Sequence, residues 1–469
     1  MPSHKPFSSA LNARCQGAIS AGDFTGMVRV YAGTNTKLYR IIKTAVTDVS
    51  KAGGYATLPD VPWSFAVHGQ RIIATNGIDP VQMYLEGTSS SFSNLITSGV
   101  TSLKAKYATI IKRWLFLANT NDSIYGNQPQ RVWWSAINDP TNFPTPGTQL
   151  AANNLSDFQD QPGGHGAIRG IAGNLGTADG AVFFERAVWR IIYSGLPNIF
   201  DFVPAEGARG LLASGSLNQY GSQVAYLAED GFYMFDGSNS LPIGKGKIDR
   251  FFLNDLQSNY LDRISSTSDP TRGLLIWAYP GVGSINGNPN RLLIYSQPFD
   301  KWTITDATSV QIEFLLRGAT FAYSLEELDS FGNIDSLAFS LDSSVWLGGK
   351  SKLAAFDVNH QYGFFDGANL AATIDSTDIE PIPGQQSQLF RISPLVDSSL
   401  ATCALASRNT INQAVVFGSD SAQEVNGSCA VNGRGRYHRI RIKVPYGTDW
   451  QQCSGVDLLE LRAVSGIGI

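Results

Sequence analysis

The feature that most constrains the fold of this chain is a repeated couplet, in which an apolar strand meets a polar turn and a second apolar strand returns. Two copies lie between residues 179 and 251. In the first, Ala181–Phe184 are followed by Glu185 and Arg186, and Val188–Tyr193 then return. Strands so rich in aromatic and β-branched residues suit a sheet that is buried on both faces. The couplet therefore predicts a hairpin that is covered on both sides.

The second copy has the clearest turn. Val224–Leu227 lead through Glu229, Asp230 and Gly231 into Phe232–Phe235. A tight hairpin turn needs a backbone conformation with positive φ, which glycine adopts and β-branched residues avoid. Asp230-Gly231 therefore predicts the position of this turn.

The same couplet recurs along most of the chain. The further copies are Val28–Ala32 with Leu38–Lys43, Arg71–Thr75 with Val81–Leu85, Trp114–Ala118 with Arg131–Ala136, Leu274–Tyr279 with Leu292–Ser296, and Leu337–Leu341 with Val345–Leu347. A spacing of about 40 to 70 residues in an all-β chain is typical of a β-propeller, whose blades cannot bury their faces alone. We predict an all-β propeller of about seven blades with a C-terminal β extension. A string of β-sandwich domains, which would give such strands without the period, is the alternative. Helical periodicity is nearly absent, and only Leu325–Asp329 fits a single turn.

The length of 469 residues is too great for one compact core. We assign residues 1–25 to an N-terminal arm or first strand, residues 26–365 to the propeller and residues 366–469 to a C-terminal β element. Its predicted strands are Ser387–Ile392, Ala401–Ser407, Ala414–Phe417 and Arg436–Val444. This element either closes the ring or forms a small sandwich beside it. Because an open ring exposes two sheet edges, we expect the N-terminal strand near Arg29 to lie close to the C-terminal part.

Composition narrows the classes of function. With 47 glycines and only 16% charged residues, the chain suits many short strands and turns, and its net charge of −4 argues against binding nucleic acid through the overall field. Four cysteines without paired metal spacing predict a reduced, cytoplasmic site of synthesis. The first residues lack an apolar segment, so we expect neither a signal peptide nor a membrane span.

No motif supports chemistry. The five histidines form no metal or triad pattern, and the glycine-rich loop at residues 161–166 lacks the lysine and serine of a phosphate-binding loop. The Asp-box turns of sialidase-like propellers are only approximated in this chain. The run Ser340-Leu-Asp342 lacks the glycine that such a turn needs, and the glycine that follows Thr267-x-Asp269, Gly273, comes too late in the sequence. Asp139-Pro140 and Asp269-Pro270 look like turn starts. We therefore predict no catalytic residue, cofactor or metal ion, and we assign the aromatic side chains to core packing rather than to stacking on sugars or bases.

One group of basic residues is expected on a single face of a predicted strand. If residues 436–444 form a strand, its two-residue period places Arg439, Arg441 and Lys443 on one side and the aliphatic residues between them on the other. This strip is a candidate DNA contact, a candidate subunit contact or a solvated edge.

Four runs resemble bacteriophage tail proteins, and more closely the tail nozzle or tail tubular proteins of short-tailed phages, including the packaged-DNA stabilisation proteins. The runs are VWWSAINDPTNF (Val132–Phe143), TADGAVFFERAVWRIIYSGLPNIFDF (Thr177–Phe202), VAYLAEDGFYMFDG (Val224–Gly237) with IGKGKIDRFF (Ile243–Phe252), and GRYHRIRIKVP (Gly435–Pro445). The likeness extends from about Gly33 to Asp457. It consists of hairpins and contains no active-site motif.

The resemblance implies a structural, non-enzymatic virion protein. Its expected state is a homohexameric ring below the portal and its adaptor protein, which retains packaged double-stranded DNA and conducts it without specific binding during genome ejection. Its expected location is the virion tail, after assembly in the host cytoplasm. Larger members carry inserted domains for tail fibres or spikes, for which 469 residues leave little room, so docking of a spike or fibre stays open. The alternative is a propeller-fold tail protein that binds or hydrolyses host-surface glycans.

Overall fold

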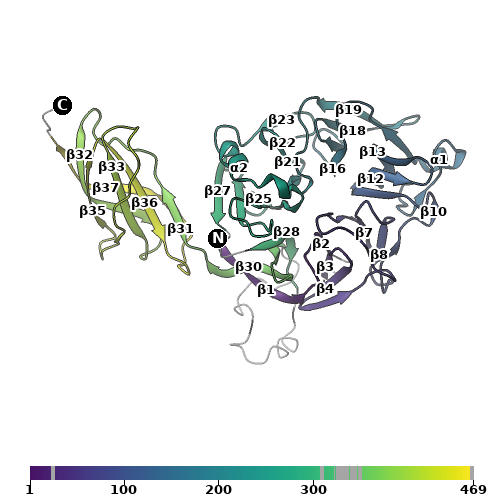
Figure 1. Ribbon diagram of the computed structural model, residues 1–469, viewed down its shortest axis with the longest axis horizontal. Helices are drawn as coiled ribbons and strands as arrows, with labels where there is room; N and C mark the ends of the chain where they lie inside the picture. Colours follow the sequence, from purple (N-terminus) through teal and green to yellow (C-terminus); the bar gives the residue numbers. More distant parts are fainter. Residues whose placement is uncertain are drawn as a thin grey trace. The chain divides into compact units, whose positions relative to one another are not determined.

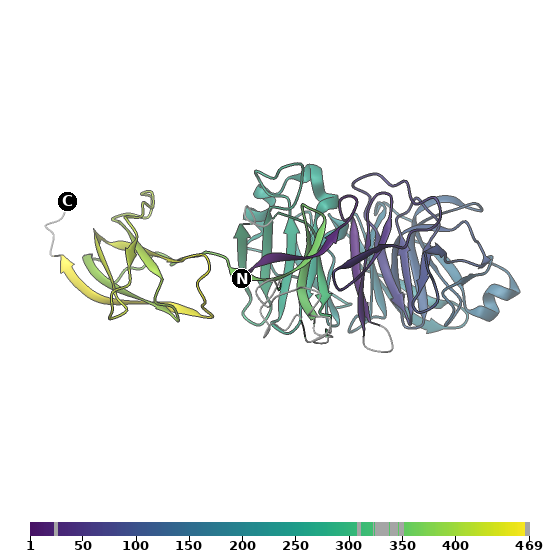
Figure 2. The same cartoon turned by 90° about the horizontal axis from the view of Figure 1, so that it is seen from below.

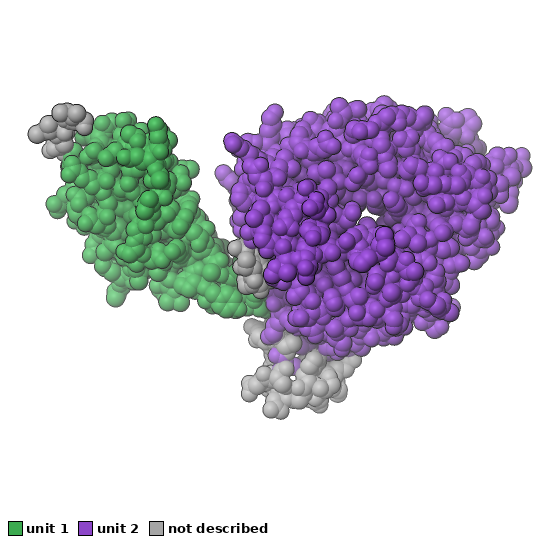
Figure 3. All heavy atoms as spheres, in the orientation of Figure 1, with its two compact units in different colours: residues 1–3, 366–469 green, residues 4–365 purple. Residues whose placement is uncertain are grey.

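The computed structural model describes residues 1–22, 27–306, 311–321, 323, 337, 346 and 351–464. The chain divides into two compact units, which are coloured separately in Figure 3. One comprises residues 4–365, and the other comprises residues 1–3 and 366–469.

The larger unit is a β-propeller whose described residues build seven four-stranded sheets, the blades. Figures 1 and 2 show them arranged around a centre. From the innermost strand outward, the blades are β2 (Gly17–Gly22), β3 (Val28–Gly33), β4 (Leu38–Ile42), β5 (Ala45–Asp48); β6 (Ser64–His68), β7 (Arg71–Thr75), β8 (Gln82–Leu85), β9 (Ser93–Asn94); β11 (Lys104–Ile111), β12 (Trp114–Asp122), β13 (Gly126–Trp134), β15 (Asp157–Asp160); β16 (Ile168–Gly173), β17 (Gly180–Phe184), β18 (Val188–Gly195), β19 (Ile199–Glu206); β20 (Asn218–Tyr220), β21 (Gln223–Ala228), β22 (Gly231–Phe235), β23 (Ser240–Pro242); β24 (Ser265–Asp269), β25 (Leu274–Tyr279), β26 (Arg291–Ser296), β27 (Lys301–Asp306); and β28 (Ile312–Ala319), β29 (Ser351–Asp357), β30 (Gln361–Asn369), β1 (Pro2–Ala10).

Both faces of a blade are buried because each packs on a neighbouring blade. Along β17, Val182 and Phe184 point into the core shared with the third blade, whereas Ala181 and Phe183 point into the core shared with the fifth. All four side chains are fully buried. Burial of one such large apolar side chain contributes about 1.5–3 kcal/mol to the free energy of unfolding, so the inter-blade cores hold the ring together. The prediction of sheets covered on both sides is confirmed.

The ring is closed by β1, which is the outermost strand of the seventh blade and pairs with β30. The side-chain oxygen of Ser8 accepts the backbone N–H of Tyr362 at 3.0 Å, and Phe7 packs on Phe364 with ring centroids 5.8 Å apart. Closure therefore comes from the first ten residues. The strand near Arg29 instead belongs to the first blade, as β3.

Six of the seven predicted couplets are confirmed as the second and third strands of successive blades. The seventh, Leu337–Leu341 with Val345–Leu347, and the helical turn at Leu325–Asp329 lie outside the described residues, except for residues 337 and 346. In the described residues the central strands of the seventh blade are β29 and β30.

Short helices occupy several connections, although the sequence showed no helical period for them. They are α1 (Gln149–Asn154), α2 (Asp249–Asp255) and the 3-10 segments η1 (Ser214–Ser216) and η2 (Ser258–Arg263). A two-stranded parallel pair, β10 (Ser98–Gly99) with β14 (Asn142–Phe143), accompanies them. A helix of one or two turns is too short to show a helical period in the sequence. Packing stabilises α2, since the ring centroids of Phe252 and Phe232 lie 4.8 Å apart.

The smaller unit is a two-sheet β-sandwich. One sheet has the order β31 (Ala372–Asp375), β36 (Tyr437–Val444), β33 (Thr402–Arg408), β34 (Ser421–Ala422), and the other has the order β35 (Cys429–Gly435), β32 (Gln386–Val396), β37 (Cys453–Val464). Leu389 and Ile392 from one sheet pack with Leu405 and Ile442 from the other. The prediction of a strand at Ala414–Phe417 is wrong, because these residues form an irregular connection.

Candidate functional site

The predicted strip lies on β36 with the expected alternation. Ile440, Ile442 and Val444 are buried in the sandwich core, each less than 5% exposed. Arg439, Arg441 and Lys443 lie on the opposite face of the same sheet. The two-residue period of this strand is therefore confirmed.

Each cation of the strip has an acidic partner in its own unit. Arg441 donates two hydrogen bonds of 2.7 Å to the carboxylate of Asp375, and these bonds hold the pKa of Asp375 below its ordinary value. Lys443 contacts Asp420 at 2.7 Å, and Arg439 contacts a third aspartate, at position 378, at 3.1 Å. A phosphate would have to displace these carboxylates, so the strip offers little free positive charge.

The other sequence candidates have structural roles. Asp139 and Asp269 each accept the backbone N–H two residues further on, at 3.0 Å, as turn residues do. Trp133 and Trp134 are almost fully buried between blades. The assignments to turns and to core packing are confirmed at these positions.

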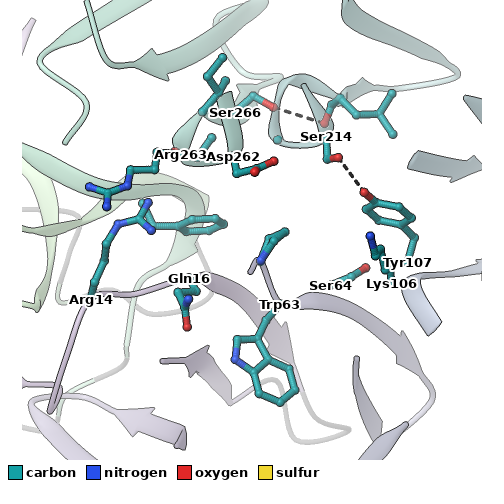
Figure 4. A pocket seen from close by; sticks show the side chains of 16 residues that line it. Arg14, Gln16, Trp63, Ser64, Lys106, Tyr107, Ser214, Asp262, Arg263 and Ser266 are labelled. Atoms are coloured by element: carbon teal, nitrogen blue, oxygen red, sulfur yellow. Dashed lines mark hydrogen bonds between the residues drawn. The ribbon is translucent and has the colours of Figure 1, made fainter. Parts of the chain in front are cut away.

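A cavity of about 200 Å³, lined by both apolar and polar side chains, lies among the inner elements of the propeller, and we call it the channel-mouth cavity. Figure 4 shows its side chains, and Figure 3 shows the opening of this unit. Successive turns of an antiparallel blade alternate between its two ends, so all connections that enter an innermost strand lie on one face of the ring. Arg14, Asp60, Ser214 and Arg263 each stand a few residues before an innermost strand. They therefore gather at the same mouth of the channel.

Two guanidinium groups share one carboxylate at this mouth. Nε of Arg263 lies 2.7 Å from Oδ1 of Asp60, and Nη1 of Arg14 lies 3.6 Å from the same oxygen. Both arginine side chains are largely buried, with 16% exposure for Arg14 and 14% for Arg263. Burial lowers the pKa of Arg14, and the neighbouring Arg263 lowers it further, while Glu313 and Asp60 raise it. The carboxylates of Glu313 and Asp60 therefore face the two guanidinium groups at this point.

Hydroxyl groups line the opposite wall in Figure 4. Tyr107 and Ser214 form a hydrogen bond of 2.7 Å, and the hydroxyl of Ser266 donates to the carbonyl oxygen of Leu217 at 3.3 Å. Burial raises the pKa of Tyr107, so its hydroxyl stays protonated at neutral pH. The exposed residues Lys106 and Asp262 complete the charged lining.

Sequence reasoning missed this cavity because Arg14 and Arg263 stand in ordinary polar connections far apart in the chain. The signal that could have found them is the propeller period. Once the couplets are located, the polar residues just before each innermost strand are expected on one face of the ring.

Arginine, lysine and hydroxyl side chains give the cavity several hydrogen-bond donors for a polar ligand. Among the described residues, the lining contains neither histidine nor cysteine, and no group of three His, Cys, Asp or Glu side chains could bind a metal ion. None of the helices in the described part of the chain has the length and apolar character that crossing a membrane requires.

Comparison with known proteins gave no match to any family model and none to a curated protein sequence. Among solved structures, the chain is similar to YCF48 bound to D1 peptide, with 10% identity and a TM-score of 0.37 over 67% of this chain and 91% of the other. It is also similar to the WD40 β-propeller domain of Doa1, with 7% identity and a TM-score of 0.39. A third similar structure is BBS1N in complex with ARL6DN, with 11% identity and a TM-score of 0.39. Both matches cover 77% of this chain and 96% of the other. The assignment of the propeller fold rests on the seven sheets themselves.

Proposed function

We propose that this chain is a structural protein of a short-tailed bacteriophage tail. Copies of it form a ring-shaped nozzle below the portal and its adaptor, which retains packaged DNA and conducts it at ejection. The proposal starts from the sequence resemblance described above. Exposed apolar side chains and the distribution of surface charge support it further.

The observation that carries the proposal is that each unit presents its own exposed apolar side chains. On the propeller, Leu196 is 73% exposed and Phe299 is 77% exposed. Both stand in hairpins between the third and fourth strands of a blade, which lie on one face of the ring. On the sandwich, Ile411 (63%) and Val416 (75%) lie in the connection before β34, and Val425 (110%) lies after it. A closed ring with head-to-tail interfaces requires two unlike surfaces on one chain, and the exposed apolar side chains of the two units are candidates for them.

The charge distribution fits a conduit through which DNA slides. Each phosphate that a protein neutralises adds affinity through counterion release, which would slow a moving duplex. The net charge is −4, and the cations of the strip on β36 are already paired with aspartates. A lumen built from such a surface would hold DNA only weakly.

The decisive experiment is cryo-electron microscopy of virions from the producing culture, with the chain traced into the tail density. We expect a ring around the tail axis below the portal. A peripheral position, a trimeric assembly or absence from the virion would contradict the proposal. In a complementation assay, Phe299→Asp and Val416→Asp should give particles that lose DNA. Ile124→Asp, at an aliphatic side chain 50% exposed on the other face of the propeller, is the matched control.

The second candidate function is binding of host-surface glycans, which the hydroxyl groups and the aromatic side chains that line the channel-mouth cavity favour. Hydrolysis would need two carboxyl groups about 5 to 10 Å apart across the sugar. Asp262 is the only carboxyl group among the described lining residues. Asp60 lies at the rim and is engaged with the two arginines. We therefore expect no release of reducing sugar from host polysaccharide. Measurable release would favour an enzyme over a nozzle.

A further inference from the structure

We propose that Cys403 and Cys429 form a reversible disulfide bond that links the two sheets of the sandwich when the chain meets an oxidant. Both cysteines are free thiols in the structure, so the bond is a covalent modification of this state. The inference uses only residues of the smaller unit and does not depend on the proposed role in a phage tail.

The first argument is strand pairing, which brings the two cysteines to one corner of the sandwich. Cys403 of β33 pairs with Ser421 of β34 in one sheet. Gln423 stands two residues after Ser421 and forms a β-bridge with Cys429, the first residue of β35 in the other sheet. Paired residues of antiparallel strands have Cα atoms about 4.5–5.5 Å apart. The turn from β34 into β35 therefore holds Cys403 and Cys429 close together, although they belong to different sheets.

The second argument is direct contact between the thiols. Both side chains are fully buried, and both lie in the core of the sandwich. The thiol of Cys403 hydrogen-bonds to the thiol of Cys429 there. A disulfide bond needs a suitable backbone separation and side chains that point toward each other. The strand pairing supplies the first condition, and the contact between the thiols supplies the second.

The third argument is that the other cysteines are placed less favourably. Cys15 belongs to the propeller unit, where its thiol donates to the carbonyl oxygen of Gly17 at 3.5 Å. Cys453 packs on the sandwich core but is only partly buried, and its thiol hydrogen-bonds to the backbone of Gly455. One particular pair is therefore favoured among the four cysteines of the chain.

The reaction is thiol–disulfide exchange with an oxidised low-molecular-weight thiol, such as glutathione disulfide. One cysteine, as its thiolate, attacks a glutathione sulfur, breaks the S–S bond and releases one reduced glutathione. The thiolate of the second cysteine then attacks the sulfur of the first, forms the protein disulfide and releases the second glutathione. The two cysteines lose two protons and two electrons, and glutathione disulfide gains them.

Burial sets the conditions of this reaction. It raises the pKa of both thiols, so they stay protonated and react slowly at neutral pH. In a reducing cytoplasm the pair therefore stays in the thiol state. Oxidation is expected after the chain leaves such a compartment, and it should accelerate with rising pH.

The test is incubation of the purified full chain with glutathione disulfide at about pH 8.5, followed by alkylation of free thiols and mass spectrometry of proteolytic peptides. We expect a linked pair of peptides that contain Cys403 and Cys429, and a fall from four alkylated cysteines to two. The bond closes a loop of about 25 residues, so calorimetry should show the unfolding temperature of the sandwich rise by roughly 5–15 °C. Dithiothreitol should reverse both changes.

Cys429→Ala should abolish the link and the rise in unfolding temperature. Cys15→Ala is the matched control, because it removes a buried thiol of the propeller, and it should leave both intact. If the native chain keeps four free thiols, the same measurement after refolding from urea in glutathione buffer removes the barrier of burial, and a link between Cys403 and Cys429 would then support the pair. Four free thiols after refolding, a link through Cys453, or mixed disulfides with glutathione alone would overturn the proposal.

Discussion

Gly231 shows how a single residue fixes a blade hairpin. It is the first residue of β22, directly after the turn formed by Glu229 and Asp230, and its φ is +140°. A Cβ atom at this position would stand 2.3 Å from the carboxylate of Asp249. That carboxylate accepts the backbone N–H of Phe232 at 3.1 Å and so connects α2 to the hairpin. A side chain at position 231 would disturb both the turn and this contact.

We therefore expect Gly231→Ala to lower the free energy of unfolding of the propeller by about 1–3 kcal/mol. Urea denaturation followed by tryptophan fluorescence measures the change. Gly207→Ala is the matched control, because Gly207 has ordinary φ and a Cβ there would meet nothing within 4 Å. Equal stability of the two variants would show that the turn relaxes at no cost.

The ion pair of Asp375 and Arg441 gives a prediction of pH dependence. The hydrogen bonds from Arg441 lower the pKa of Asp375 from its ordinary value of 3.8. A carboxyl group with a lowered pKa in the folded state stabilises the fold above the unfolded pKa, and this contribution is lost as the pH falls through the folded pKa.

Both side chains are about one third exposed, so solvent weakens the pair. We expect Asp375→Asn to cost about 0.5–1 kcal/mol of unfolding free energy at pH 7 and much less at pH 3. Chemical denaturation at the two pH values measures the difference. Arg441→Gln should cost a similar amount at pH 7, and the double variant should cost little more than either. Additive effects would mean that the two side chains act independently.

At the scale of elements, β1 is the strand on which closure of the ring depends. Phe7 of this strand is 7% exposed and packs in the core that the first and seventh blades share. Phe7→Ala should therefore cost about 3–5 kcal/mol of the propeller's unfolding free energy, as other buried phenylalanines do. Phe299→Ala, at a side chain 77% exposed, should change it by less than about 0.5 kcal/mol. A small effect of Phe7→Ala would show that the ring is stable without this closure.

The same elements show which parts of the fold the sequence could predict. Hairpins such as β21–β22 were predictable because apolar runs and the Asp230-Gly231 turn are local signals. The outer strands were not, because residues such as Ser93 and Asn94 of β9 become strand only by pairing with β8. For β1 the sequence PSHKPFSSA left an arm and a first strand open, because it is short of apolar residues and Phe7 is its only large one. Closure depends on pairing across more than 350 residues, which no local pattern reveals.

The candidate sites divide in the same way. The alternation of Arg439, Arg441 and Lys443 could be predicted from the two-residue period of a strand. Their acidic partners could not, since Asp375 is 66 residues away from Arg441 in the chain. The pairing of Arg14 with Arg263 around Asp60 follows only from the closed ring, which brings connections of different blades to one mouth.

At the scale of the whole molecule, the chain consists of two units with separate hydrophobic cores. The sandwich core around Leu389 and Ile442 contains only residues of the smaller unit, and the inter-blade cores contain only residues of the propeller. Domains with their own cores commonly unfold as separate cooperative units. We therefore expect two transitions when the purified chain is heated in a calorimeter.

Substitutions in each core assign the two transitions. Ile442→Ala removes a side chain that is 4% exposed in the sandwich, and it should cost about 2–5 kcal/mol and lower the temperature of one transition only. Phe7→Ala should lower the other transition only, because Phe7 packs between blades. If both variants moved both transitions together, the units would unfold as one cooperative body. The sandwich would then contribute to the stability of the propeller, and a core substitution in one unit would destabilise the other as well.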